Sequence, residues 1–282
     1  MAAYMYMRFP GGKSRALTLS YDDCVEQDIR LMEIMDRYGL KGTFNLNGGL
    51  YPSEDKVYEE GCIHRRLTER RATEIFANSG HEVAIHGYEH QSLGEIPAVL
   101  ATVDVIKDRE ALEKQFGRVI RGMAYANGSY NDDVVQILKS CGVAYARTTV
   151  ATRNFTIPTD WLRLPTTCHH TDPRLMELAQ SFISTESRQP RLFYLWGHSY
   201  EFERDNNWEL IERFAACVGN HEDVWYATNM EVYKYVEAFR ALQFSVSFDR
   251  VYNPTAISVC FAIRASGNWR YVTVDPGQTV SL

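Results

Sequence analysis

Short apolar runs alternate with amphipathic stretches along most of the chain. Residues 15–21 form an apolar run, and residues 25–38 then carry apolar side chains at helical spacing before Gly39. The same alternation continues to about residue 241. We expect further strands at 41–47, 81–85, 118–125, 143–147, 162–165, 192–196 and 224–227. We expect helices at about 68–79, 97–116, 131–140, 206–218 and 229–241, and another that begins at 172. Strict alternation of strands and helices predicts a parallel sheet, and about seven units predict a closed or nearly closed α/β barrel.

From about residue 244 the pattern changes to short strand-like stretches. They lie at 244–248, 256–263, 269–274 and 279–282, with turn residues between them at 253–254, 266–268 and 276–277. This pattern predicts a small antiparallel β appendage at 243–282. A unit of this size buries little apolar surface alone, so we expect it to pack on the barrel formed by residues 1–242.

Composition and charge narrow the choice of function. The 282 residues carry a net charge of -6, which argues against a surface for nucleic acid or anionic membranes. No apolar run approaches the ~18 residues that span a bilayer, and the N-terminal residues lack the basic and apolar regions of an export signal. We therefore expect a cytoplasmic protein, and its oligomeric state stays open.

The cysteines give little sign of a redox motif. None of the six belongs to a Cys-x-x-Cys pair, so we expect reduced and mostly buried thiols. Cys168, His169 and His170 are consecutive residues of types that bind metals. Because adjacent side chains usually diverge, we favour a loop or packing role for them over a metal site.

Chemically active side chains follow three of the expected strands. Asp22 and Asp23 end the first strand, His86 and His90 lie four residues apart after the third, and His198 follows a later one. Adjacent carboxylates near an interior repel each other and lose hydration, so they need a cation, a proton or strong donors. The carboxyl ends of parallel strands share one face of a barrel, so we expect these side chains to meet. Two imidazoles and one carboxylate leave open positions on a zinc-like ion, as a hydrolytic site requires, and the other carboxylate can transfer protons.

The motifs around these residues resemble those of the polysaccharide deacetylase family (carbohydrate esterase family 4, NodB-homology domain). The family's Thr-Phe-Asp-Asp-Gly motif corresponds to Ser20-Tyr21-Asp22-Asp23-Cys24, its paired histidines to His86 and His90, its Asp-Trp motif to Asp160-Trp161, and its Leu-x-His motif to Leu195-Trp196-Gly197-His198 with one extra residue. The resemblance covers about 15–242 and implies a distorted (β/α)7 barrel.

The resemblance assigns a metal site and an acid–base pair. It implies that Asp23, His86 and His90 hold a divalent metal. Zinc fits this ligand set best, and cobalt or nickel would also be accepted. The resemblance further implies that Asp22 is the general base for the attacking water and that His198 is the general acid for the leaving group. A histidine near neutrality suits the second task.

The resemblance also assigns supporting residues. Asp160 would set the protonation of His198, and Trp161 would wall the pocket for the acetyl methyl group. Asn127 stands in place of the tyrosine of the third motif, and its backbone amide could help to hold an oxyanion. Tyr130 lies in the same motif and is a candidate for contact with the substrate.

The third motif departs from the family pattern. The family has an Arg before Pro-Pro-Tyr-Gly, whereas residues 124–130 read Ala-Tyr-Ala-Asn-Gly-Ser-Tyr. The usual arginine partner of the catalytic aspartate is therefore missing, and Arg121, Arg147 and Arg163 are the candidates to replace it. Cys24 replaces the glycine of the first motif, where it either packs or offers a reactive thiol.

Three functions remain open at the level of the sequence. The leading hypothesis is a metal-dependent deacetylase that acts on an N- or O-acetylated oligosaccharide or glycoconjugate. A second is C–N cleavage in a small cyclic amide, as in metal-independent relatives of this barrel, and the intact Asp23, His86 and His90 argue against it. A third is a non-catalytic sugar-binding protein, which the missing arginine and several aromatic residues favour.

Overall fold

The strand β2 (Arg15–Asp22) lies at the centre of the main sheet, and every one of its residues is buried. The computed structural model describes residues 4–265 and 268–282. β2 pairs in parallel with a strand on each side, and the burial of all eight of its residues is typical of a strand covered on both faces. The other parallel strands are β3 (Gly42–Leu46), β4 (Glu82–Ile85), β5 (Gly122–Ala124), β6 (Tyr145–Ala151), β7 (Leu164–Thr166), β8 (Cys168–His169), β9 (Arg191–Gly197) and β10 (Val224–Tyr226).

The parallel sheet closes on itself. Its order is β7-β6-β5-β4-β3-β2-β9-β8, and β10 pairs with the first half of β2. Only Thr167 separates β7 from β8, so this one stretch pairs with β6 on one side and with β9 on the other. Taking β7 and β8 together, seven parallel strands form the ring. The predicted distorted (β/α)7 barrel is confirmed.

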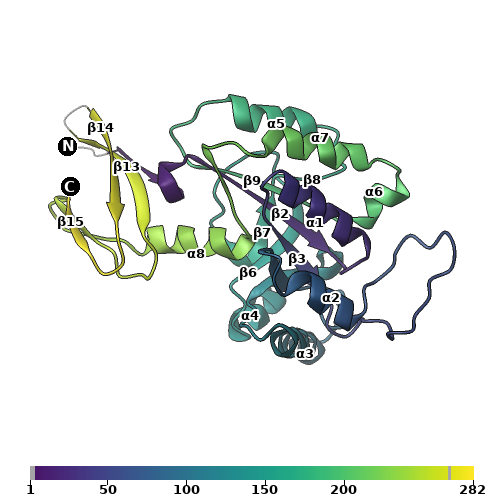
Figure 1. Cartoon of the computed structure of the whole chain (residues 1–282). Coiled ribbons are helices and arrows are strands. Elements are labelled where there is room, and N and C mark those ends of the chain that lie inside the picture. Colours follow the sequence, from purple (N-terminus) through teal and green to yellow (C-terminus); the bar gives the residue numbers. More distant parts are fainter. Residues whose placement is uncertain (1–3, 266–267) are drawn as a thin grey trace.

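Helices surround the barrel (Figure 1). They are α1 (Gln27–Arg37), α2 (Glu69–Phe76), α3 (Ala98–Phe116), α4 (Asp132–Ser140), α5 (Leu175–Ser184), α6 (Tyr200–Arg204), α7 (Trp208–Val218) and α8 (Asn229–Arg240). Helix α4 is capped by Asn131, whose side chain accepts a hydrogen bond from the Val134 amide. Helix α6 was not expected, since five residues are too few to show a periodic pattern. Across the described residues, every helix is too short or too polar to cross a membrane.

The expected strand at 118–125 is the largest difference in the barrel. Only β5, at 122–124, forms there, because Gly117 ends α3 with a left-handed backbone and residues 118–121 lead into the strand. The next strand, β6, instead continues four residues past the predicted end at 147 to Ala151. Both differences concern strand ends, which the hydrophobic pattern places poorly.

The appendage consists of two small antiparallel sheets at one end of the molecule (Figure 1). One contains β11 (Gln243–Phe244), β12 (Arg250–Tyr252) and β15 (Thr279–Ser281), and the other contains β1 (Tyr4–Arg8), β13 (Val259–Ala265) and β14 (Asn268–Val274). The sequence pattern did not reveal β1, which pairs along its whole length with β13. The expected turn at 266–268 falls largely outside the described residues.

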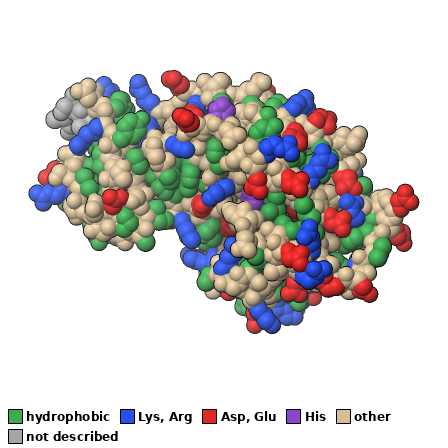
Figure 2. Space-filling model, in the orientation of Figure 1, with side chains coloured by type: hydrophobic (Ala, Val, Ile, Leu, Met, Phe, Trp, Pro, Cys, Tyr) green, Lys and Arg blue, Asp and Glu red, His purple; other side chains and the backbone are tan. Residues whose placement is uncertain are grey.

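The appendage packs on the barrel through the end of α8. Phe261 is fully buried in a cluster that also contains Ala238 and Leu242 from α8 and its end, and its ring lies 6.4 Å from that of Phe239. Over the visible face of the barrel, acidic and basic side chains are interspersed, whereas hydrophobic side chains are more frequent on and beside the appendage (Figure 2). The two parts therefore share an apolar contact.

Replacing Phe261 by alanine should loosen this contact. Phe261 is 0% exposed, and truncation of a buried phenylalanine costs about 3–5 kcal/mol. Tyr271, on the neighbouring strand, is 65% exposed and provides the matched control, for which we expect a change within about 0.5 kcal/mol. Urea unfolding followed by circular dichroism measures both values. Equal losses in the two variants would show that the apolar face of the appendage does not stabilise the fold.

Candidate metal and acid–base site

The two adjacent aspartates point to different partners because the backbone turns between them. Asp22 is the last residue of β2, whereas Asp23 and Cys24 have φ values of 82° and 56°. This left-handed conformation is uncommon for residues other than glycine and changes the direction of the side chains that follow the strand. Cys24 thus keeps the backbone conformation that glycine favours at its position in the family motif, and its thiol is buried.

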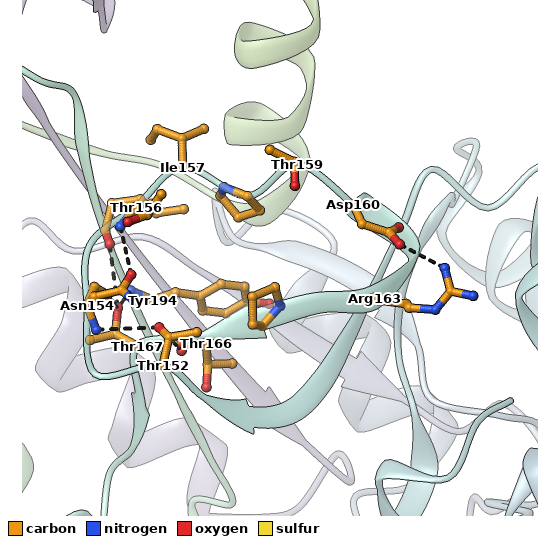
Figure 3. Close-up of a pocket in the computed structure, with 13 residues that line it drawn as sticks. Thr152, Asn154, Thr156, Ile157, Thr159, Asp160, Arg163, Thr166, Thr167 and Tyr194 are labelled. Atoms are coloured by element: carbon orange, nitrogen blue, oxygen red, sulfur yellow. Dashed lines mark hydrogen bonds and ion pairs between the residues drawn. The ribbon is translucent and has the colours of Figure 1, made fainter. Parts of the chain in front are cut away.

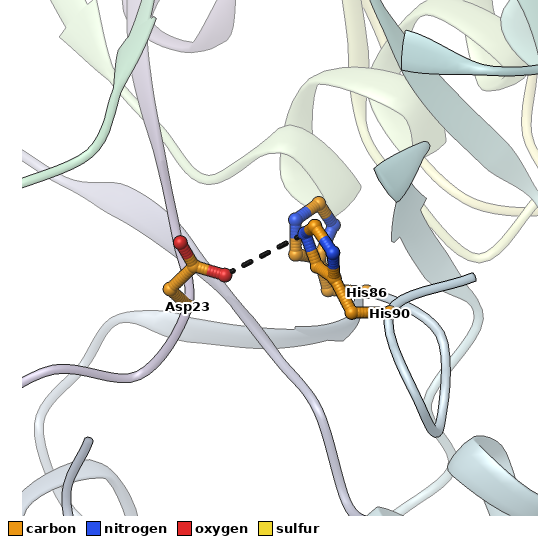
Figure 4. Close-up of side chains that lie close together, drawn as sticks. All are labelled: Asp23, His86 and His90. Atoms are coloured by element: carbon orange, nitrogen blue, oxygen red, sulfur yellow. Dashed lines mark ion pairs between the residues drawn. The ribbon is translucent and has the colours of Figure 1, made fainter. Parts of the chain in front are cut away.

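His86 and His90 lie beside Asp23 (Figure 4). The Nε2 atom of His90 is 3.7 Å from Oδ1 of Asp23, and the two imidazole rings meet edge to face at 4.8 Å. The Nδ1 atom of His86 is 2.9 Å from the carbonyl oxygen of Ala124. An Nδ1–H donated to a carbonyl leaves Nε2 free to bind a metal. The three residues offer ligand atoms that all lie within 4.8 Å of one another.

Two carboxylates of α3 hold the loop that carries the histidines. Asp104 and Asp108 lie one helical turn apart. Asp108 accepts hydrogen bonds from the amides of His86 at 3.0 Å and Gly48 at 2.7 Å, and Asp104 accepts one from the amide of Tyr88 at 3.0 Å. Burial raises the pKa of Asp108 to about 8. These hydrogen bonds hold the loop against α3, so the two histidines are in position before a substrate binds.

Two further side chains, which the sequence analysis did not identify, also contact Asp23. Nε2 of His64 lies 3.3 Å from one oxygen, and Nη2 of Arg66 lies 3.2 Å from the other. Both residues come from the long connection between β3 and α2, and only the cationic stretch at 64–66 could have drawn attention to them.

The protonation states of the cluster suit metal binding. Burial alone would raise the pKa of Asp23, but the hydrogen bond to His64 and the charges of His86 and Arg66 outweigh it and hold the pKa well below its usual range. Burial and the neighbouring His86 lower the pKa of His90 to about 4. Near neutral pH, Asp23 is therefore ionised and His90 is neutral, which are the forms that ligate divalent metals.

A buried ion pair holds Asp22. Nη2 of Arg147, on β6, lies 2.5 Å from Oδ2 of Asp22, and both side chains are at most 2% exposed. The guanidinium also lies over the ring of Trp196, at 4.3 Å from its centroid, and Asn45 donates a hydrogen bond to the other carboxylate oxygen at 2.8 Å. Burial alone would raise the pKa of Asp22, but Arg147 and then His86 and His198 lower it. Asp22 is therefore ionised.

Arg147 supplies the arginine that the third motif lacks. Of the other two candidates, Arg121 donates to the carbonyl oxygen of Gly142, and Arg163 pairs with Asp132 and Asp160. The guanidinium thus reaches the aspartate from strand β6 instead of from the end of β5.

His198 lies between two carboxylates. It follows β9, and its Nε2 atom is 3.8 Å from Oδ2 of Asp22. Its Nδ1 atom is 3.5 Å from Oε2 of Glu201, on the unexpected helix α6. Burial alone would lower the pKa of His198, but the interaction with Glu201 and the charges of Asp22 and Asp23 raise it. An imidazolium is therefore favoured at this position.

Glu201 makes the contact to His198 that the resemblance had assigned to Asp160. Asp160 accepts a hydrogen bond from the Leu162 amide at 3.1 Å and pairs with Arg163 at 2.8 Å. Both charged residues line a separate cavity of about 360 Å³ that is rich in threonine (Figure 3). The structure thus places Asp160 on a surface loop, away from the imidazole it was expected to contact.

The three expected substrate-contacting residues make contacts elsewhere. The indole Nε1–H of Trp161 donates to Glu237 of α8 at 2.8 Å. The side chain of Asn127 donates to the Ser92 hydroxyl at 3.1 Å, and the ring of Tyr130 stacks on that of Tyr125 at 4.7 Å. Asn127 and Tyr130 follow β5 and so lie at the same edge of the barrel as the histidines, whereas Trp161 packs against α8.

Comparisons with known proteins agree with this geometry. Residues 10–146 match the sequence profile described as polysaccharide deacetylase, and a search of curated proteins returned no match. The matched stretch is just under half of the chain, and over it the sequence is similar to the polysaccharide deacetylase family. Members of this family are generally deacetylases.

Solved structures share the fold at low sequence identity. A presumptive polysaccharide deacetylase from Mycobacterium smegmatis has a TM-score of 0.59 at 18% identity, over 83% of this chain and 94% of that one. Puue allantoinase has a TM-score of 0.59 at 12% identity, over 80% and 91%. A family 4 carbohydrate esterase from Streptomyces lividans, in complex with acetate, has a TM-score of 0.50 at 13% identity, over 76% and 93%. At these identities the likeness concerns the fold alone.

Removing the guanidinium of Arg147 should leave the buried carboxylate of Asp22 without a cationic partner. We expect Arg147→Met to lower the free energy of unfolding of the chelator-treated protein by about 3–5 kcal/mol at pH 7. In the wild type, the lowered pKa of Asp22 contributes stability above the unfolded pKa, and this contribution is lost as the pH falls through the folded value. In the variant, burial raises that pKa, so the difference from wild type should shrink as the pH falls.

Urea unfolding at pH 5 and pH 7 measures this effect. Arg163→Met removes an exposed arginine that also pairs with two carboxylates, and as the control it should cost at most about 1 kcal/mol. Adding Asp22→Asn to Arg147→Met should recover much of the loss, because the unpaired charge is gone. A double variant no more stable than Arg147→Met would contradict the role of the ion pair.

Proposed function

We propose that the protein is a metal-dependent hydrolase that removes acetyl groups from an N- or O-acetylated carbohydrate. One observation carries the proposal. Oδ2 of Asp22 lies 3.8 Å from Nε2 of His86 and 3.8 Å from Nε2 of His198. A carboxylate kept ionised by Arg147 therefore stands between a candidate metal ligand and a candidate acid. The remaining support is the similarity to the polysaccharide deacetylase family.

The chain's own residues fit a divalent metal. Asp23, His86 and His90 supply one carboxylate and two imidazoles, and the carbonyl of Ala124 orients His86 with Nε2 free. This ligand set leaves open positions, and zinc, cobalt or nickel would suit it. When bound, such an ion would polarise the acyl oxygen and make a water molecule more acidic.

Asp22 and His198 divide the proton transfers. Asp22 is ionised and takes the proton from the attacking water, while Arg147 and Asn45 hold the carboxylate in position. His198, whose pKa is raised, donates a proton to the departing nitrogen or oxygen. Oε2 of Glu201 faces Nδ1 of this imidazole at 3.5 Å, and Nε2 faces Asp22.

The substrate class follows from the family and not from the cavity. We propose an acetylated oligosaccharide or glycoconjugate, with N- and O-acetyl groups both chemically accessible to this acid–base pair. The fold likeness to an allantoinase keeps a cyclic amide as the alternative substrate to test.

Acetate release from a panel of N- and O-acetylated oligosaccharides, with allantoin included, tests the proposal. Chelator-treated protein should be inactive, and zinc or cobalt should restore the release. Asp22→Asn should lower kcat by about 10²–10⁴-fold while metal binding is kept, because it removes the base and leaves the ligands. Asp205→Asn, at a surface ion pair with Arg204, is the matched control.

Each other outcome points to a different function. Hydrolysis of allantoin alone would replace the deacetylase with a C–N hydrolase. Metal binding without hydrolysis of any substrate in the panel would favour a sugar-binding protein on the same barrel.

The basic limb of the pH profile should report the contact between Glu201 and His198. The acid must be protonated, so the rate falls as the pH rises through the pKa of His198. Glu201→Gln removes a charge that raises this pKa, and we expect the descending, high-pH side of the kcat profile to move toward lower pH. Asp160→Asn should leave the limb in place, because Asp160 pairs with Arg163. A shift with Asp160→Asn but not with Glu201→Gln would reverse the assignment.

A further inference from the structure

His169 and His170 both point to the same carboxylate. Nε2 of His169 lies 3.2 Å from Oε2 of Glu201, and Nε2 of His170 lies 3.1 Å from the same oxygen. The expectation that these adjacent side chains diverge was wrong. Strand β8 ends at His169, and the backbone turns at His170, so the alternation of side chains along a strand no longer applies. The two rings lie 4.4 Å apart.

Three imidazoles crowd one oxygen atom. Besides His169 and His170, Nδ1 of His198 lies 3.5 Å from Oε2 of Glu201, while Oε1 pairs with Arg204, also at 3.5 Å. A carboxylate oxygen has about two lone pairs for hydrogen bonds, so three ring nitrogens are more than Oε2 can satisfy. Nδ1 of His198 is in fact buried without a hydrogen-bond partner. A cation among these atoms would give each of them a partner.

We infer that His169, His198 and Glu201 form a second site for a divalent metal, distinct from Asp23, His86 and His90. The ligand atoms of the three residues all lie within 4.8 Å of one another. Nitrogen and oxygen ligands at about 2.1 Å from a tetrahedral zinc lie about 3.4 Å apart, and the nitrogen–oxygen distances of 3.2 Å and 3.5 Å match this spacing.

The surroundings of the cluster also suit a metal. Nδ1 of His169 lies 2.7 Å from the hydroxyl oxygen of Thr171 and accepts a hydrogen bond from the Thr171 amide at 3.2 Å, and these contacts hold the ring with Nε2 toward Glu201. His170 is buried, its ring lies 4.2 Å from that of Phe202, and its Nε2 atom contacts Glu201 from the interior side. The second site thus has an oriented histidine, a fixed carboxylate and a third ligand in His198.

Occupation of this site would inhibit the hydrolase, a consequence that rests on the proposed function. The metal binds the lone pair of Nδ1 of His198, and the proton that would make the ring an imidazolium goes to solvent. The ring keeps only its Nε2–H, which in a neutral imidazole is a far weaker acid than in an imidazolium. One equivalent of zinc would therefore support activity, and a second would suppress it.

Equilibrium dialysis against Zn²⁺, with the metal measured by mass spectrometry, tests the site without an activity assay. Wild-type protein should take up two equivalents. His169→Ala should keep one and bind the second at least about tenfold more weakly. His90→Ala should also keep one, and the double variant should keep neither. His221→Ala, at a histidine bonded to the Cys217 carbonyl outside both clusters, is the matched control and should keep two.

Glu201→Gln provides a second route to the same result. It keeps the size of the side chain but removes the charge, and it should also lose the second equivalent, with circular dichroism confirming the fold. Uptake of one equivalent by the wild type, or of two by folded His169→Ala, would overturn the inference.

Activity measurements separate the site from the proposed function. If acetate is released, excess zinc should inhibit the wild type at least about tenfold more strongly than His169→Ala. Two equivalents of zinc without acetate release would support the second site and refute the hydrolase. Release that excess zinc suppresses equally in both proteins would refute the inhibitory role of the site.

Discussion

The buried ion pair between Asp22 and Arg147 is the interaction on which the site depends. Two consecutive carboxylates at the end of a buried strand repel each other, and each loses hydration. The left-handed backbone at Asp23 turns one toward the histidines, and Arg147 neutralises the other. Without the guanidinium, Asp22 would take up a proton and could not serve as a base. The ion pair thus sets the charge of the proposed base, while the turn decides which carboxylate meets the two histidines of the candidate metal site.

The position of Arg147 also shows how a site can lack the arginine of a sequence motif and still place a guanidinium beside the same aspartate. The third motif has lost its arginine, yet a guanidinium arrives from the next strand of the barrel. Parallel strands bring their ends to one edge, so neighbouring strands can supply the same charge to the same point. The partner of His198 differs from the family assignment in a similar way, because Glu201 lies three residues beyond the histidine on its own short helix.

The parts of the structure that repeat could be predicted, and the parts that rely on distant contacts could not. Alternating apolar runs gave the barrel and the common edge where Asp22, His86 and His198 meet. The sequence contains three arginines that could pair with Asp22. Only the folded barrel, in which Arg147 lies on β6 beside β5, decides among them. His64 and Arg66 come from an irregular connection with no periodic signal. Asp160 matched a motif in sequence, but its loop carries it to a different cavity.

The pairing of β1 with β13 has a consequence for the order of folding. During synthesis β1 emerges before the barrel, whereas its partner emerges only after the whole barrel has been made. The barrel can form as soon as its own strands are complete, but β1 has no partner until β13 has emerged from the ribosome. An aromatic-rich strand with open hydrogen-bonding edges is exposed throughout this interval, so β1 is the segment of the nascent chain most in need of protection from association with other chains.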